Sequence, residues 1–158
     1  MHEARMMREL ANLNLTARAT FAKIARLVEV LEFDNMTICK GVVLVVEDHP
    51  LVRISVLEVL VEAGFEALEA SSAVEAIWLL EARSDVHLVF TDAEMSGTMD
   101  GIELVHYIRN RWPPVKLIVV SGKTEIAPEE LPRGAKFFPK PYRERTIVEA
   151  MVGMLSAR

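Results

Sequence analysis

Five polar side chains in this sequence follow apolar runs, and together they could carry out phosphoryl chemistry. They are Glu47 and Asp48 after residues 42–46, Asp92 after 87–91, Ser121 after 116–120 and Lys140 after 136–138. Three carboxylates held close together repel one another, and a divalent cation relieves that repulsion. Carboxylate oxygens suit Mg²⁺, while a hydroxyl and an ammonium group can bind the remaining oxygens of a phosphoryl group. These residue types predict a metal-assisted phosphoryl site with Asp92 as the nucleophile.

The elements that must position these residues are short strands. The candidate strands are Val42–Val46, Phe65–Leu68, His87–Thr91, Lys116–Val120 and Lys136–Phe138. Three of these runs are nearly continuous in Val, Ile, Leu and Phe, which is typical of strands buried on both faces of a parallel sheet. Helical patterns alternate with them, so the predicted fold class is α/β, a doubly wound sheet of five parallel strands. Ligands of such sheets bind beyond the carboxyl ends of the strands, where the five polar residues would meet.

Four amphipathic segments are predicted to be helices. Their expected inward residues are Leu51, Ile54, Leu57 and Val61 after Pro50; Ala76, Ile77 and Leu80 after a capping box at Ser72–Glu75; Ile102, Val105 and Ile108 after Asp100; and Ile147, Ala150, Met151 and Met154 within about 143–156. Trp78 and Trp112 are expected to pack against the sheet. Between residues 124 and 133, Pro128 and Pro132 predict a single helical turn or an irregular loop.

Residues 1–40 follow a different pattern and form a predicted N-terminal extension, ahead of a domain at 41–158. Apolar side chains recur there every three or four residues, at Met6, Leu10, Leu13, Ala17, Phe21, Ile24, Val28 and Leu31. This stripe predicts one long amphipathic helix before the sheet. Three interpretations stay open: the helix forms a homodimer, it packs on the following domain, or the natural chain starts at Met36 and the segment is not native.

Composition excludes several classes of protein. The chain has 158 residues, 51% of them hydrophobic, and a net charge of −5, which rules out a disordered chain. Its longest stretch without a charged side chain is eight residues, far below the roughly 20 that a membrane span needs. Residues 41–158 carry a net charge of −6 and no basic stripe, so direct nucleic-acid binding is not expected. A single cysteine, Cys39, and the lack of a signal-peptide pattern predict a cytoplasmic protein.

Five short motifs, in this order along the chain, resemble the signature set of response-regulator receiver domains. They are Val-Val-Glu47-Asp48, Phe-Thr-Asp92, Met99-Asp100-Gly101, Val-Val-Ser121-Gly and Phe137-Phe-Pro-Lys140-Pro141. The resemblance covers about residues 41–157. It implies a flavodoxin-like fold that takes a phosphoryl group from a histidine kinase or phosphotransfer protein onto an aspartate.

Carried over by position, the resemblance also implies a set of metal ligands. Asp92 is the phosphoacceptor, and Asp48 and Asp92 bind Mg²⁺ directly. Glu47 acts mainly through water, and the backbone carbonyl of Glu94 completes the protein ligands.

The remaining family positions are also present. Ser121 turns toward the phosphoryl group, Lys140 pairs with it, and Phe137 stands where the family has its switch aromatic. Three features depart from the family pattern. Ser96 replaces the usual proline after the phosphoacceptor, Thr98 is one extra residue in that loop, and Pro128 with Pro132 alters the fourth crossover, which most receivers use to signal. Ser96 and Thr98 are expected to reshape the loop after the phosphoacceptor.

The function implied is a stand-alone receiver, because only two residues follow the last predicted helix. Such a receiver signals by protein–protein contact to an unknown downstream protein, and it is no enzyme beyond catalysing its own phosphorylation and dephosphorylation. A receiver-like interaction module that does not depend on phosphorylation is the alternative, which the loop departures keep open. An aspartate-nucleophile phosphatase of the haloacid dehalogenase type is less compatible, since its nucleophile follows the first strand.

Overall fold

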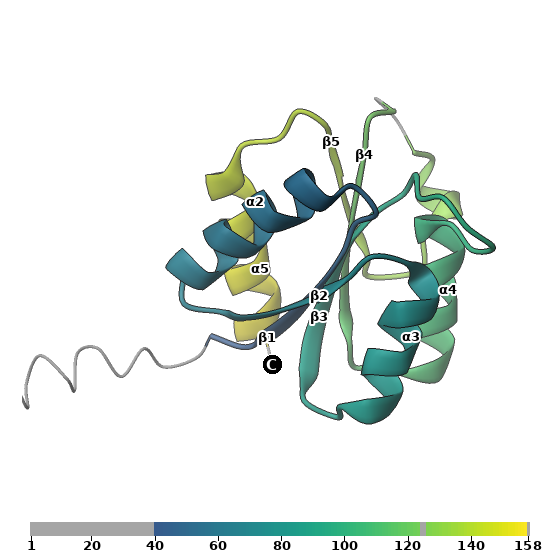
Figure 1. Cartoon of the computed structure of the whole chain (residues 1–158), viewed down its shortest axis with the longest axis horizontal. Coiled ribbons are helices and arrows are strands. Elements are labelled where there is room, and N and C mark those ends of the chain that lie inside the picture. Colours follow the sequence, from purple (N-terminus) through teal and green to yellow (C-terminus); the bar gives the residue numbers. More distant parts are fainter. Residues whose placement is uncertain (1–39, 124–125, 158) are drawn as a thin grey trace, which may run out of the picture. The chain divides into compact units, whose positions relative to one another are not determined.

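The computed structural model describes residues 40–123 and 126–157, which form a parallel sheet between two layers of helices (Figure 1). The strands are β1 (Val42–Val46), β2 (Glu66–Ala70), β3 (Val86–Asp92), β4 (Lys116–Ser121) and β5 (Lys136–Pro139). Their order across the sheet is β2-β1-β3-β4-β5, and every neighbouring pair is parallel. The predicted doubly wound, flavodoxin-like fold is therefore confirmed. The strand order reverses between β1 and β3, and ligand sites of open sheets lie beyond such a point.

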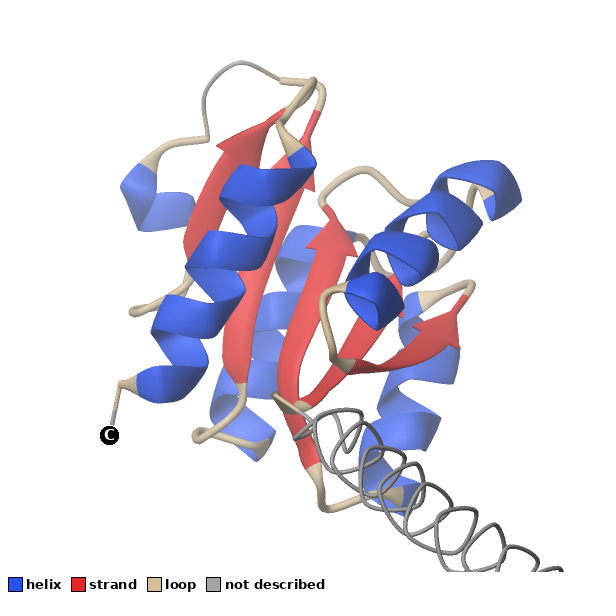
Figure 2. Cartoon of the chain, turned by 90° about the vertical axis from the view of Figure 1, so that its left-hand side faces the viewer, coloured by secondary structure: helices blue, strands red, loops and turns tan. Residues whose placement is uncertain are grey.

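Within the described residues, four helices and one short turn cover the two faces of the sheet, as can be followed in Figure 2. They are α2 (Pro50–Glu62), α3 (Ala73–Ala82), α4 (Gly101–Arg111) and α5 (Glu144–Ser156), with the 3₁₀ turn η1 (Pro128–Glu130) before β5. One apolar core joins the sheet to α3, α4 and the η1 region, and a second joins the opposite face to α2 and α5. The single turn η1 confirms the prediction for the proline-rich crossover.

The central strands owe their place to side chains that are apolar on both faces. All five residues of β1 are buried, with Leu44 in one core and Val45 in the other. Phe90 of β3 and Ile118 of β4 are buried in the same core as Val45. β-branched and aromatic residues suit such a pleated, doubly covered surface.

Helix α2 buries a different face from the predicted one. Leu51, Ile54 and Val61 are 71%, 48% and 61% exposed, whereas Leu60 is buried and Leu57 packs partly against the core. The prediction was wrong because apolar residues occur on all sides of this helix, so spacing alone could not select the inward face. As a result, α2 presents an exposed apolar face, here defined as Leu51, Ile54 and Val61.

Helix α3 differs from the prediction in two details. The Ser72 hydroxyl caps it by accepting from the amide of Glu75 at 3.2 Å, but the Glu75 carboxylate accepts from the amide of Ser71 rather than that of Ser72. The predicted capping box is therefore only half formed. Trp78 is 70% exposed and does not pack against the sheet, whereas Trp112 does contact the core.

The predicted helix of residues 1–40, with its proposed dimer contact and the alternative start at Met36, falls outside the described residues except for Lys40 at its end. None of the helices in the described part of the chain is long and apolar enough to cross a bilayer.

Candidate functional site

The site lies where the carboxyl ends of four strands meet. β1 leads into Glu47 and Asp48, β3 ends at Asp92, β4 ends at Ser121, and Lys140 follows β5. The strands run in the same direction, so these ends share one edge of the sheet (Figure 2). Asp92 and Ser121 are the last residues of their strands rather than the first residues after them, which gives both a fixed backbone.

Lys140 joins the two buried carboxyl groups of the site. Its Nζ hydrogen-bonds to Oδ2 of Asp92 and lies 3.7 Å from Oε2 of Glu47. Asp92 and Glu47 are only 6% and 3% exposed, and a carboxylate so far removed from water requires a polar partner. Oδ1 of Asp92 accepts from the backbone amide of Glu94 at 2.9 Å. The predicted nucleophile is thus held through both oxygens.

The protonation equilibria of Glu47 and Lys140 reflect this arrangement. Burial raises the pKa of Glu47, and the charge of Asp92 adds to this, although the amide of His49 donates to Oε1 at 3.0 Å and acts in the opposite direction. Burial acts to lower the pKa of the Lys140 ammonium group, but its hydrogen bond to Asp92 and the charges of Asp92 and Glu47 outweigh it and raise that pKa. Lys140 therefore remains a cation beside Asp92.

Asp48 faces the loop that follows β3. Its Oδ2 accepts from the backbone amide of Ser96 at 3.0 Å and from the Ser96 hydroxyl at 2.9 Å. The hydrogen bond from the Ser96 amide is the main reason that the pKa of Asp48 lies below its ordinary value. Ser96 stood out in the sequence as a departure from the family pattern, but its contact with Asp48 was not predicted.

The donor atoms of the site suit Mg²⁺ in type. Asp48, Asp92 and Glu47 supply carboxylate oxygens, and backbone carbonyls lie in the same loops, which is the hard-oxygen chemistry that Mg²⁺ prefers. Within residues 40–123 and 126–157, no three His, Cys, Asp or Glu side chains are gathered closely enough to hold a metal ion. Asp48 is bonded to Ser96 and Asp92 to Lys140 instead. The residue types fit the ion, but a preformed cluster of three carboxylates is not present in that part of the chain.

Ser121 and Phe137 occupy the positions predicted for a switch. Ser121 is fully buried; its Oγ accepts from the amide of Lys123 at 2.9 Å and lies 3.5 Å from Oε1 of the exposed Glu94. Phe137 is half-buried and lines a hollow of about 440 Å³ beside η1. The structure brings Ser121 to the edge that carries Asp92, while the switching role of both residues stays a prediction.

Gly101 belongs to one of the sequence motifs, but its structural role was not predicted. Its amide donates to the carbonyl of Ala93 at 3.0 Å, and a Cβ at Gly101 would lie 1.8 Å from the backbone oxygen of Asp92. Helix α4 therefore begins in direct contact with the backbone of Asp92, and a side chain at this position would obstruct that contact. A glycine at the first position of a helix, immediately after the cap residue Asp100, was the available signal.

Arg53 and Thr91 were also missed. From the first turn of α2, Nη1 of Arg53 donates to the carbonyl of Glu47 at 2.7 Å, and Nε donates to Oε2 of Glu69 at 2.9 Å. The buried hydroxyl of Thr91 donates to the carbonyl of Asp92 at 2.9 Å. Neither contact could be read from spacing, because each depends on where the backbone carbonyls point.

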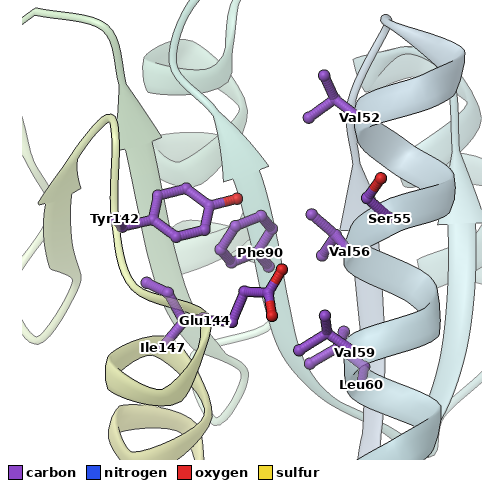
Figure 3. Close-up of a pocket in the computed structure, with 9 residues that line it drawn as sticks. All are labelled: Val52, Ser55, Val56, Val59, Leu60, Phe90, Tyr142, Glu144 and Ile147. Carbon is purple, nitrogen blue, oxygen red and sulfur yellow. The ribbon is translucent and has the colours of Figure 1, made fainter.

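An apolar cavity of about 190 Å³ lies between α2 and the segment that precedes α5 (Figure 3). Val56 and Val59 line it from α2, Phe90 from the sheet, and Tyr142 and Ile147 from the opposite side. The rings of Phe90 and Tyr142 meet edge to face with centroids 6.0 Å apart, and burial raises the pKa of Tyr142. Because Tyr142 follows Lys140 by two residues, this cavity adjoins the segment that carries the site's cation.

Comparisons with known proteins agree with this geometry. The model of the response regulator receiver domain matches residues 43–152. The sensor kinase CckA of Brucella abortus is 37% identical over 117 residues, which are 72% of this chain but only 12% of that kinase. The chemotaxis protein CheY1 of Helicobacter pylori is 30% identical over 114 residues, 68% of this chain and 91% of that protein. A crystal structure of the receiver domain of the hybrid histidine kinase CckA superposes with a TM-score of 0.63 at 29% identity, covering 73% of this chain and all of that domain.

The family match extends over most of the described residues, and the fold is the one expected for it. Asp92, Ser121 and Lys140 lie at the strand ends where the sequence motifs placed them. The chain belongs to the family of response regulator receiver domains.

Proposed function

We propose that this receiver accepts a phosphoryl group from a histidine kinase or a phosphotransfer protein onto Asp92. The observation that carries the proposal is the pairing of a buried aspartate at the end of β3 with the Lys140 ammonium group. A carboxylate oxygen of Asp92 attacks phosphorus, the bond from phosphorus to the donor's histidine nitrogen breaks, and an acyl phosphate forms. Lys140 and the Ser121 hydroxyl bind the phosphoryl oxygens, whose negative charge is the main obstacle to transfer.

The proposed metal ligands are the side chains of Asp48 and Asp92 and the backbone carbonyl of Glu94, with Glu47 acting through water. Mg²⁺ bound there supplies positive charge for the phosphoryl oxygens. Asp48 remains ionised in this role, because the bonds from Ser96 lower its pKa. Glu47 is the more deeply buried acid and has the raised pKa, which suits an indirect part.

The exposed apolar face of α2 is the surface proposed to contact the phosphodonor. Leu51 and Ile54 lie in the first half of a helix that begins two residues after Asp48, so they flank the site. Exposed apolar side chains grouped on one helix face are typical of protein contacts. Output is likewise proposed to be a protein–protein contact in the cytoplasm, with Ser121 and Phe137 changing position after transfer.

Intact-mass measurement after incubation with Mg²⁺ and a small acyl phosphate tests the transfer step. We expect one added phosphoryl group, absent from Asp92→Asn and from a sample with chelated metal. Phosphate release is measured in parallel, so that rapid hydrolysis is not mistaken for failure. No adduct and no release from folded protein would favour the module that does not depend on phosphorylation. Repeated turnover of small phosphomonoesters would favour the phosphatase instead.

A further inference from the structure

Ser96 makes two hydrogen bonds to the carboxylate of Asp48, although the two residues lie 48 positions apart in the chain. The neighbouring Glu47 side chain also interacts with this carboxylate. The backbone amide and the hydroxyl of Ser96 both donate to the same oxygen, Oδ2, at 3.0 and 2.9 Å. Hydrogen bonds to an ionised acceptor are stronger than those between neutral groups. Two such bonds to one oxygen restrict rotation of the whole carboxylate. The other oxygen, Oδ1, takes no part in this contact.

The residues on either side of Ser96 shape its loop, and the one before it is anchored in the core. Met95, immediately before it, is buried, and its sulfur accepts a hydrogen bond from the Thr91 hydroxyl at 3.9 Å. Gly97, immediately after it, has a φ of +121°, a conformation that other residues rarely adopt. Ser96 is therefore presented to Asp48 by an anchored backbone, even though its own side chain is exposed to solvent.

We propose that Ser96 is a positioning residue for Mg²⁺. It orients Asp48 so that one carboxylate oxygen is held by the loop and the other is available to bind the metal ion. The inference rests on the proposed function, in which Asp48 binds Mg²⁺. It deepens that function by coupling the loop after the phosphoacceptor to the acidic residues after β1. Hydrogen-bond partners of ligating carboxylates commonly change metal affinity by about 10- to 100-fold when removed. Because Ser96→Ala removes only the hydroxyl and keeps the amide, the expected loss is at the lower end, about tenfold.

Titration with Mg²⁺, followed by the amide NMR signals of Glu94 and its neighbours, tests this proposal without any phosphoryl transfer. We expect Ser96→Ala to weaken Mg²⁺ binding about tenfold, with the urea midpoint of the metal-free protein unchanged. Ser96→Thr keeps both donors and should bind like wild type. Thr98→Ala, an exposed hydroxyl deletion two residues further along the same loop, is the matched control and should also bind like wild type.

Each outcome bears on a different claim. Ser96→Ala binding Mg²⁺ as tightly as wild type, or more tightly, would overturn the positioning role. So would a loss shared equally by Ser96→Ala and Thr98→Ala, because it would reflect the loop in general. Asp48→Asn separates the two proposals: if it binds Mg²⁺ like wild type, Asp48 is not a ligand, and the proposed metal site fails together with the role of Ser96.

Discussion

The contact between Gly101 and the backbone of Asp92 gives a prediction whose size can be worked out from distances. In Gly101→Ala, the new Cβ would lie 1.8 Å from the oxygen of Asp92, 2.7 Å from its carbonyl carbon and 2.9 Å from Cα of Ala93, whereas ordinary contacts begin at 3.4 Å. All three atoms belong to the backbone, so no side-chain rotation can relieve the overlap. Either the first turn of α4 or the backbone that carries the nucleophile must move.

Overpacking of a filled interior costs about 1–3 kcal/mol, and a backbone clash belongs at the upper end of that range. The better helix propensity of alanine returns at most about 1 kcal/mol. We therefore expect Gly101→Ala to lower the free energy of unfolding by about 2 kcal/mol, which is roughly 6–10 °C in Tm for a domain of this size. Displacing the nucleophile by about 1 Å can slow a reaction as much as 100-fold, so phosphorylation by an acyl phosphate should be at least about tenfold slower.

Urea unfolding followed by circular dichroism measures the first effect, and intact mass against time measures the second. Gly153→Ala is the matched control: Gly153 is exposed on α5, and a Cβ there would meet nothing within 4 Å. That variant should be as stable as wild type or up to about 1 kcal/mol more stable. A Gly101→Ala protein that unfolds at the wild-type midpoint and is phosphorylated at the wild-type rate would refute the proposed role of this close contact.

Three further predictions concern the cap of α4, the exposed helix face and the site's cation. Asp100→Ala removes the side-chain acceptor that caps the amide of Glu103 at 2.8 Å, while the bond from the Asp100 amide to the Glu103 carboxylate can still form. Urea unfolding should therefore show a loss of about 0.5–2 kcal/mol, most of which Asp100→Asn restores. Ile54→Glu places a charge on the exposed apolar face of α2; we expect transfer from the cognate phosphodonor to slow at least about tenfold, while phosphorylation by an acyl phosphate is unchanged, and equal slowing of both would count against a docking role. Asp92 raises the pKa of Lys140 in the folded state. The charged Lys140 side chain therefore contributes its full share of stability at pH values below its ordinary pKa of 10.5. That share is lost as the pH rises through the folded-state pKa. The difference in unfolding free energy between wild type and Lys140→Met should therefore stay constant from neutral pH to about 10 and shrink above it, and a difference that does not change with pH would show that Lys140 contributes no charge pairing.

The strand ends were predictable from the sequence because a strand that is apolar on both faces must be buried between two layers, in the centre of the sheet. Val42–Val46 shows this best, since its predicted and observed bounds coincide. Parallel pairing then fixes which ends meet, and this alone brings Asp92, Ser121 and Lys140 to one edge. Side chains at those ends inherit their position from the backbone, so their types were enough to indicate the chemistry.

The face of α2 could not be predicted in the same way. Leu51, Ile54 and Val61 have helical spacing, but so do Val56 and Leu60, and only packing against the sheet selects between the two sets. Where a helix is apolar all round, the periodic pattern still predicts the helix but no longer its orientation. The apolar residues that do not pack against the sheet remain exposed and can contact a partner. The residues wrongly predicted to face inward therefore form the candidate docking surface of α2.

Ser96 marks a different limit, because its contribution depends on a donor that the family pattern lacks at this position. A proline there has no amide hydrogen and no hydroxyl, so neither bond to Asp48 could form. From sequence alone, the replacement indicated only that the loop would differ. With the structure, the same replacement adds two donors aimed at a candidate metal ligand from a loop that the buried Met95 anchors. A departure from a family pattern therefore becomes informative when the new side chain's partner is known, and here that partner is an acid of the site itself.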